Sequence, residues 1–274
     1  MTIPIEILAI IFVYIEYEKL DAIYKGIKSL RNKMNKTLFY KTYLKYKNKE
    51  ELFKLGIEKG YIYLISILLY DIDPSVDNNE AIRNASHKGY TEIVSLLLKD
   101  PRVNPSADNN YAIRWASYND HIETIKLLLK NKGADPSANN NQAICWASKN
   151  GHTETIKLLL TDKRVDPSTN DNYAIRWASY NGHTETVKVL LKDRRVEPSV
   201  YNNNAICIAS SLDYTETVKL LLADPRVYTK LARCNGRMEL IKRRLNNAEK
   251  RLKLSRPAPP FLHLVNSVVD ELPM

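Results

Sequence analysis

The chain has 274 residues, of which 44% are hydrophobic, so it can bury a core of its own, and it carries a net charge of +10. Its three cysteines form no close pair, which argues against a disulfide framework or a zinc site and favours a reducing compartment: Cys145, Cys207 and Cys234. The longest apolar runs, residues 7–15 and 61–70, are each about half the length of a membrane span, which argues against a transmembrane protein.

The first element expected along the chain is a helix within residues 3–20. Pro4 can begin a helix, and the apolar residues at positions 7, 8, 11, 12 and 15 form one helical face. No Lys or Arg precedes this run, which fits a signal peptide poorly, so we expect an intracellular, cytoplasmic protein. One interpretation of the segment is an amphipathic helix that only caps the rest of the chain.

The same segment resembles the first half of an F-box, whose Leu-Pro-x-Glu-Leu-Leu, Ile-Phe, Tyr-Leu and Leu steps have the spacings found here. The resemblance implies a three-helix module that docks on a Skp-family adaptor of cullin–RING ubiquitin ligases. The residues implied at that interface are Pro4, Ile7, Leu8, Ile11, Phe12 and Leu20. The second half departs from the family, because Lys25, Gly26 and Ser29 stand where it has apolar, Cys and Trp residues.

Further along the chain, a repeat of 31 residues dominates the sequence. Each unit has a Pro-Ser step, an Asn-rich pair that suits left-handed turn geometry, an Ala-Ile step and an Ala-Ser step. The Pro-Ser steps begin at Pro74, Pro105, Pro136, Pro167 and Pro198. Such spacing predicts stacked units, because neither half of a unit could bury its apolar face alone.

Each unit reads as two helices. In the fourth repeat, the first helix has apolar residues at helical spacing, namely Ala174, Ile175, Trp177 and Ala178. It ends at Asn181-Gly182. A second helix begins near residue 184, with an apolar stripe at residues 187, 190 and 191. The next Pro-Ser step then breaks the chain.

The repeat resembles the ankyrin family. Its second half matches closely, in Asn150-Gly151-His152 and in the Glu-Thr-Ile/Val-Lys-Leu-Leu-Leu helices. Its first half departs, because Tyr111-Ala112 begins a step that replaces the family's Thr-Pro-Leu-His, and the unit is shorter than the family's usual length of about 33 residues. Ankyrin proteins of giant viruses are most similar to this variant. The resemblance implies a mainly α, ankyrin-type helical solenoid that binds a target protein on its concave face, in the host cytoplasm if the protein is viral.

We therefore expect three parts: an F-box-like helical segment at residues 1–46, an ankyrin array at 47–236 and a basic helix with a Pro-containing tail at 237–274. The clear repeats cover 73–227, and degenerate helix pairs are expected at 51–69 and 228–245. The charge is uneven along the chain, +4 over residues 1–72, −1 over 73–224 and +7 over 225–274. The excess positive charge therefore belongs to the ends.

The candidate target-binding residues are the pairs just before the inter-helix glycine position, which vary between otherwise near-identical units. They are His87, Lys88, Tyr118, Asn119, Lys149, Asn150, Tyr180 and Asn181, with Ser211 and Leu212 in the last unit. Tyr118 and Tyr180 are the best anchors, because a tyrosine offers a large contact area with few rotors. The alternative is that they are ordinary exposed tyrosines.

Two other recurring residue types invite functional interpretations. Tryptophans at positions 115, 146 and 177 could form an aromatic groove. We favour packing between repeats, because residues at the same position of successive repeats stack on one another in a solenoid. Histidines at 121, 152 and 183 would lie about 10 Å apart in stacked helices, too far to share one zinc ion at about 2.3 Å. No motif for phosphate binding or nucleophilic catalysis occurs, so we expect no enzyme, no metal and no cofactor.

The basic segment at residues 233–256 could bind nucleic acid or an acidic membrane surface. We favour the solvated face of a terminal helix, with Leu240, Ile241, Leu245 and Leu252 on its apolar side. The leading hypothesis is a monomeric substrate adaptor that joins a Skp-family protein to a target protein. A plain binding scaffold and a nucleic-acid-associated protein are the alternatives, and we expect no membrane partner.

Overall fold

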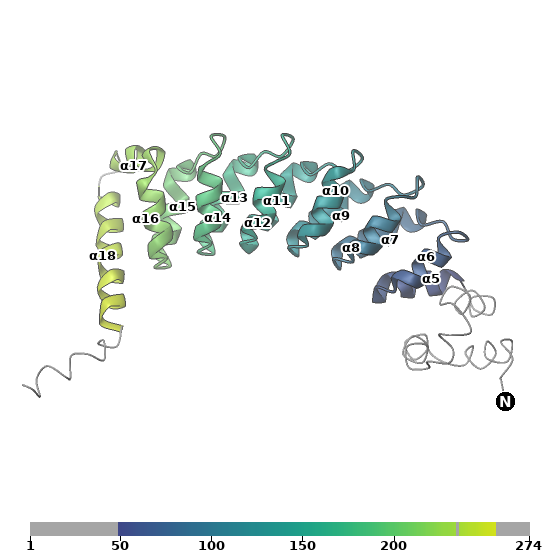
Figure 1. Cartoon of the computed structure of the whole chain (residues 1–274). Helices are drawn as coiled ribbons and strands as arrows, with labels where there is room; N and C mark the ends of the chain where they lie inside the picture. Colours follow the sequence, from purple (N-terminus) through teal and green to yellow (C-terminus); the bar gives the residue numbers. More distant parts are fainter. Residues whose placement is uncertain (1–48, 234–235, 256–274) are drawn as a thin grey trace, which may run out of the picture. The chain divides into compact units, whose positions relative to one another are not determined.

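The computed structural model describes residues 49–233 and 236–255 (Figure 1). Within these residues the regular elements are all α-helices, fourteen in number, labelled α5 to α18. The mainly α fold predicted from the repeat is therefore confirmed. The F-box-like segment expected at residues 1–46, with its implied interface residues from Pro4 to Leu20, lies outside the described residues, as does the Pro-containing tail beyond residue 255.

The described helices belong to two compact units. The first contains residues up to 147 together with 154–166, and the second contains 148–153 together with 167 onward. The first unit holds α5 (Lys49–Lys59), α6 (Ile62–Leu68), α7 (Val76–His87), α8 (Thr91–Leu97), α9 (Ala107–Tyr118), α10 (Ile122–Lys130) and most of α11 (Ala138–Asn150) and α12 (Thr153–Leu159). The second holds α13 (Thr169–Tyr180), α14 (Thr184–Leu191), α15 (Val200–Ser211), α16 (Thr215–Ala223), α17 (Pro225–Ala232) and α18 (Arg237–Ser255).

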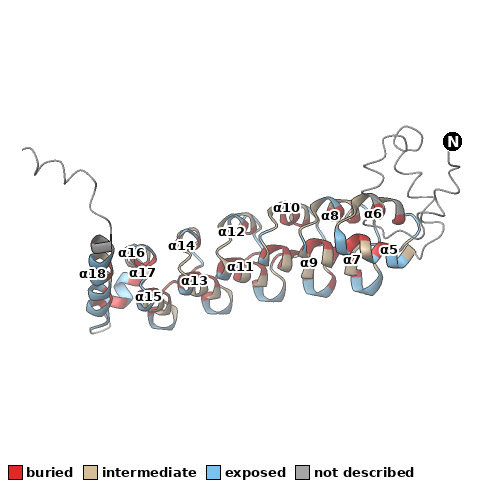
Figure 2. Cartoon of the chain, turned by 90° about the horizontal axis from the view of Figure 1, so that it is seen from below, coloured by how far each residue is buried: buried red, intermediate tan, exposed pale blue. Residues whose placement is uncertain are grey.

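In each unit the repeats stack as helix pairs in two rows (Figure 2). We call the odd-numbered helix of each pair, from α5 to α15, its first helix, and the even-numbered one its second. In the first unit α7 packs between α5 and α9, and α8 packs between α6 and α10. In the second unit α13 packs on α15 and α14 on α16. Stacking therefore buries faces that an isolated pair would expose, as expected for a solenoid.

The core consists of aliphatic residues at recurring positions. Every first helix from α7 to α15 buries one isoleucine completely, and every second helix from α8 to α16 buries one leucine completely. These residues are Ile82, Ile113, Ile144, Ile175 and Ile206, and Leu97, Leu128, Leu159, Leu190 and Leu221. Burial of each contributes roughly 1.5–3 kcal/mol, so the periodic apolar pattern of the sequence is also the main source of stability.

The first helices share an unusual beginning. Three consecutive residues have left-handed φ angles between 48° and 64° before the right-handed turns start. The triplets start at Asp77, Asp108, Asn139, Asn170 and Tyr201. Fourteen of the fifteen residues are Asn or Asp, the types that tolerate this conformation best, and Tyr201 is the exception. The left-handed geometry expected for the Asn pair is confirmed and extends over one residue more.

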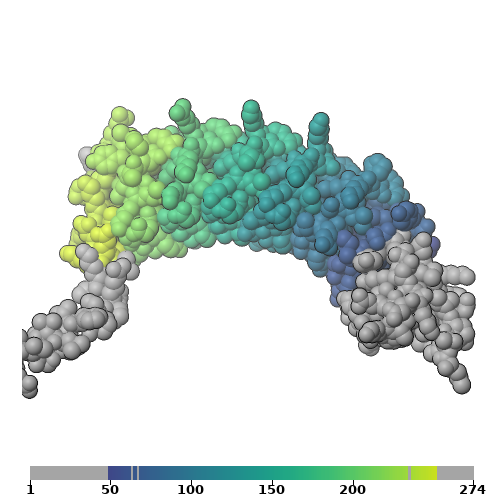
Figure 3. Space-filling view, in the orientation of Figure 1, coloured from purple at the N-terminus to yellow at the C-terminus, as the bar shows by residue number. Residues whose placement is uncertain are grey.

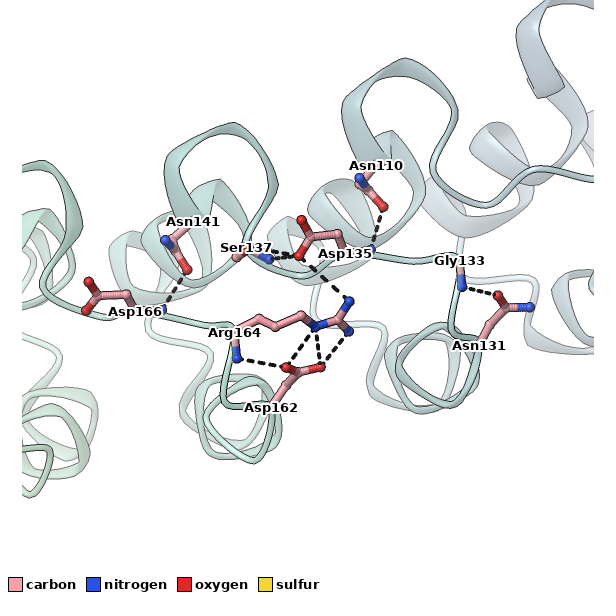
Figure 4. Close-up of polar contacts among 9 residues, drawn as sticks. All are labelled: Asn110, Asn131, Gly133, Asp135, Ser137, Asn141, Asp162, Arg164 and Asp166. Atoms are coloured by element: carbon pink, nitrogen blue, oxygen red, sulfur yellow. Dashed lines mark hydrogen bonds and ion pairs between the residues drawn. The ribbon is translucent and has the colours of Figure 1, made fainter.

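The third residue of each triplet connects its repeat to the next one (Figure 4). Asn110 is buried, and its Oδ1 accepts the backbone N–H of Asp135 at 2.7 Å. The equivalent bonds join Asn79 to Asn104, Asn141 to Asp166 and Asn172 to Glu197. The last member of the series, Asn203, is buried with no hydrogen-bond partner for its amide among the described residues, because the equivalent backbone N–H, that of Tyr228, lies in α17 and donates to the carbonyl of Asp224.

The connections after α8, α12, α14 and α16 are tight turns, each held by a carboxylate. Asp162 accepts the backbone N–H of Arg164 at 3.0 Å and pairs with its guanidinium at 2.7 Å (Figure 4). The same arrangement occurs at Asp100 and Arg102, Asp193 and Arg195, and Asp224 and Arg226. The arginine side chain lowers the pKa of each of these carboxyls. In the space-filling view, side chains project from these connections (Figure 3).

Atypical helix pairs occur where the degenerate end units were expected. The first expected pair corresponds to α5 and α6, and the second to α17, which ends at Ala232, and α18, which begins at Arg237. α18 is anchored by Met238, Ile241 and Ala248, which are buried. The predicted apolar side of this helix is wrong at Leu240, whose side chain is 48% exposed, because the anchoring face is set by the residues at 238, 241 and 248 instead.

Candidate target-binding surface

The predicted target-binding pairs lie at the carboxyl ends of the first helices. His87 and Tyr118 are the last residues of α7 and α9, and Tyr180 is the last residue of α13. Asn119 and Asn181 follow directly as the C-cap residues of α9 and α13. The periodic phase therefore placed these pairs correctly on the fold, and their surroundings decide which of them can meet a partner.

In the first unit, five aromatic side chains form a cluster that we call the aromatic patch: His87, Tyr111, Trp115, Tyr118 and Trp146. The His87 ring stacks on Trp115 at 4.8 Å between centroids, and Tyr111 stacks on the same indole at 5.5 Å. Trp115 and Trp146, from successive repeats, meet edge to face at 5.1 Å. The expected packing of these tryptophans between repeats is confirmed, yet both remain half-exposed.

Tyr118 is the outermost ring of this patch. It is 39% exposed, and it contacts Trp115 at 5.3 Å and Trp146 at 5.5 Å between centroids, in edge-on geometry. The arginines of α7 and α9 lie over the neighbouring Tyr111 ring, with Arg83 at 5.4 Å and Arg114 at 5.9 Å from its centroid. The patch therefore combines a fixed aromatic ridge with positive charge.

The second unit presents a smaller version of the same arrangement. Trp177 lies between Tyr173, at 5.5 Å, and Tyr180, at 5.1 Å between centroids. The Nζ atom of Lys149 lies 5.0 Å from the centroid of the Trp177 ring. Tyr180 is 45% exposed. Both predicted tyrosine anchors are thus partly exposed and supported from below by an indole ring.

The asparagines of the predicted pairs perform a different task. Asn119 Nδ2 donates to the backbone carbonyl of His87 at 3.0 Å, and His121 Nε2 donates to the same carbonyl at 2.9 Å. Asn181 and His183 hold the carbonyl of Lys149 in the same way, each at 3.0 Å. These side chains satisfy carbonyls at helix ends across a repeat boundary, so they stabilise the stack.

Lys88 and Asn150 are also not simply exposed side chains. Lys88 is exposed, but its Nζ donates to the carbonyl of Glu58 in the preceding repeat at 2.8 Å. Asn150 is half-buried at the end of α11. Four of the eight predicted residues have aromatic or cation–π contacts: His87, Tyr118, Lys149 and Tyr180. They form the candidate surface together with the tryptophans, which the sequence analysis assigned to packing, and with Tyr111 and Tyr173, to which it gave no role.

Neither a metal centre nor a membrane span emerges from the part of the chain that the structure describes. No group of three or more His, Cys, Asp or Glu residues could hold an ion there. The loop residues His121 and His183 are instead engaged with backbone carbonyls. Among the same residues, no helix is both long enough and apolar enough to cross a membrane.

Comparison with known proteins agrees with this geometry. A family model described as ankyrin repeats (3 copies) matches residues 53–140 and 144–230, which together make up more than half of the chain. None of the curated proteins matches the chain. Repeats of this family indicate a scaffold for protein–protein interaction. The chain belongs to the ankyrin repeat family.

Proposed function

We propose that this protein is a non-catalytic scaffold that binds a target protein through the aromatic patch of its first unit and the Tyr173–Trp177–Tyr180 row of its second. The observation that carries the proposal is the pair of partly exposed tyrosines, Tyr118 and Tyr180, each backed by an indole ring. Tyrosine and tryptophan dominate binding hot spots because they bury large areas and keep a polar group for hydrogen bonding.

The contacts below these rings favour tight binding. Trp115 and Trp146 restrict the Tyr118 ring to one position, so little side-chain entropy remains to be lost when a partner covers it. Arg83, whose guanidinium lies over the Tyr111 ring and whose side chain is 21% exposed, would complement acidic groups at the edge of the partner's contact surface. A target with an apolar contact surface and an acidic rim fits this description.

Affinity purification with the full-length chain tests the proposal. Tyr118→Ala combined with Tyr180→Ala should weaken the captured target by at least about 2 kcal/mol, which is roughly thirtyfold in Kd. Tyr70→Ala is the matched control, because Tyr70 is 89% exposed and lies outside the aromatic patch. Loss of target with the control variant, or its retention by the double variant with an unchanged Kd, would assign binding to another surface.

The finer proposal is that the scaffold recruits a cullin–RING ubiquitin ligase through its F-box-like N-terminal segment. Its support is the residue pattern from Pro4 to Leu20. If the segment docks on a Skp-family adaptor, charging Ile11 or Phe12 by Ile11→Asp or Phe12→Asp should abolish binding, because a charge buried in an apolar interface is costly.

Direct binding of purified protein to a purified Skp-family adaptor is the measurement. The helical content and melting temperature of each variant serve as the control for folding, and both should match the parent protein. Failure of the unmodified full-length chain to bind any such adaptor would leave a plain ankyrin scaffold as the function.

A further inference from the structure

A groove lies between α5 and α7 in the first unit, where these two first helices pack side by side (Figure 2). Its volume is about 540 Å³. Phe53, Ile57, Ile72, Val76 and Ala81 provide an apolar lining, and Val76 is 48% exposed. The groove thus offers apolar surface that is separate from the aromatic patch.

The groove is open because two bulky residues of the repeat are missing. In the next interval, between α7 and α9, Tyr111 and Trp115 stack together and on His87. The residues 31 positions earlier, Glu80 and Asn84, line the groove and are too small and polar to fill it in the same way. The space that an indole occupies in the interior repeats is therefore available to a ligand here.

The border of the groove is acidic. Among the residues that the structure describes, six carboxylates line it, and Lys54 is the only cation in the lining; the carboxylates are Glu50, Glu58, Asp71, Asp73, Asp77 and Glu80. Lys54 pairs with Asp77 at 3.0 Å, and Lys49 with Asp71 at 2.8 Å, but these side chains are 43–64% exposed. Such surface pairs contribute at most about 1 kcal/mol each, so cations of a ligand can compete with them.

We infer that this groove is a second binding site, for a Lys- or Arg-rich segment of a partner protein that inserts one large aromatic or aliphatic side chain. The apolar lining receives the inserted side chain in the position of the missing indole. The basic residues on either side of it meet the acidic border. This site is independent of the aromatic patch, beside which the half-buried Arg83 carries positive charge.

Fluorescence anisotropy with the full-length chain and a labelled peptide, Lys-Arg-Trp-Leu-Arg-Lys, tests the inference. Asn84→Trp restores the indole of the interior repeats and leaves the charge of the groove unchanged. It should weaken binding at least about tenfold, because the new side chain fills the groove. Glu58→Gln with Glu80→Gln leaves the space open and should weaken binding by about five- to tenfold by removing charge.

The matched control is Glu123→Gln with Glu154→Gln, which removes the same charge from exposed positions on α10 and α12 of the same unit. It should leave binding unchanged, as should Tyr118→Ala. Equal effects of the groove and control substitutions, or equal binding of Lys-Arg-Gly-Ser-Arg-Lys, would reduce the interaction to nonspecific charge and overturn the inference.

Two other occupants give distinct outcomes that also overturn it. A second copy of the chain in the groove would appear as self-association in sedimentation equilibrium that Asn84→Trp abolishes. Residues 1–48 of the same chain in the groove would prevent the full-length protein from binding either peptide.

Discussion

At the scale of single residues, the buried asparagine at the end of each left-handed triplet explains why the Asn-rich pair recurs. The left-handed conformation costs most residue types roughly 1–2 kcal/mol each, and Asn reduces that cost. Its side chain then satisfies a backbone N–H of the next repeat, as Asn172 does for Glu197 at 2.6 Å. Asparagine at this position therefore both permits the left-handed backbone and bonds one repeat to the next.

Two members of the series allow these roles to be separated. Asn172 and Asn203 are both buried and left-handed, with φ of 57° and 64°, but only Asn172 has an N–H to accept. Asn172→Ala should lower the free energy of unfolding by about 1–3 kcal/mol more than Asn203→Ala, because it leaves the Glu197 N–H without a partner. Urea denaturation of both variants measures the difference, and equal losses would show that the contact between repeats contributes nothing.

The sequence predicts where the binding pairs lie but not what each side chain does. The helical phase places Tyr118 and Asn119 correctly at the end of α9, since the repeat length fixes that phase. It cannot tell a displayed asparagine from one that reaches the carbonyl of His87 in the preceding repeat. The recurring Asn-x-His step, with the histidine bonded to the same carbonyl, was the available signal.

At the scale of elements, the connections after α8, α12, α14 and α16 each form around one aspartate. Asp193 accepts the backbone N–H of Arg195 and pairs with its guanidinium, whereas in the connection after α10 the neutral Asn131 accepts the N–H of Gly133 at 2.9 Å. The backbone turn therefore needs only an acceptor, and the carboxylate adds an ion pair. Helix boundaries were predictable from Pro-Ser steps and glycines, but these turn contacts depend on side-chain geometry.

Asp193→Asn converts one type of turn into the other and should depend on pH. The Arg195 side chain lowers the pKa of Asp193 in the folded protein, so its contribution is present above the unfolded-state pKa and is lost as the pH falls through the folded-state value. At pH 7 the substitution should cost at most about 1 kcal/mol, and the cost should shrink below about pH 4.

Urea denaturation of parent and variant at pH 7 and pH 3 measures this cost. Asn131→Ala, which removes the neutral acceptor of the Gly133 N–H from the equivalent turn after α10, is the control and should show the same cost at both pH values. A cost for Asp193→Asn that is independent of pH would mean that the ion pair adds no stability.

At the scale of the whole molecule, the net charge of +10 is concentrated outside the repeats, and α18 shows how one end carries it. Ile241 is buried, and Arg251 and Glu249 pair with Asp213 and Lys219 of the preceding repeat. Arg243 and Arg244 are exposed. The helix is thus oriented by apolar contacts and ion pairs, which leaves the consecutive arginines in solvent, as expected for a solvated terminal face.

This arrangement predicts weak, nonspecific binding to nucleic acid. Binding dominated by phosphate contacts falls steeply with salt, so a labelled 20-nucleotide single strand or duplex should not be retained at 150 mM salt. At 20 mM salt any retention should decrease equally for Arg243→Gln with Arg244→Gln and for Lys99→Gln with Lys130→Gln, which removes the same charge from exposed positions of the first unit. Tight retention at 150 mM salt that only the α18 variant loses would instead make this helix a nucleic-acid site, because a distributed charge cannot distinguish the two variants.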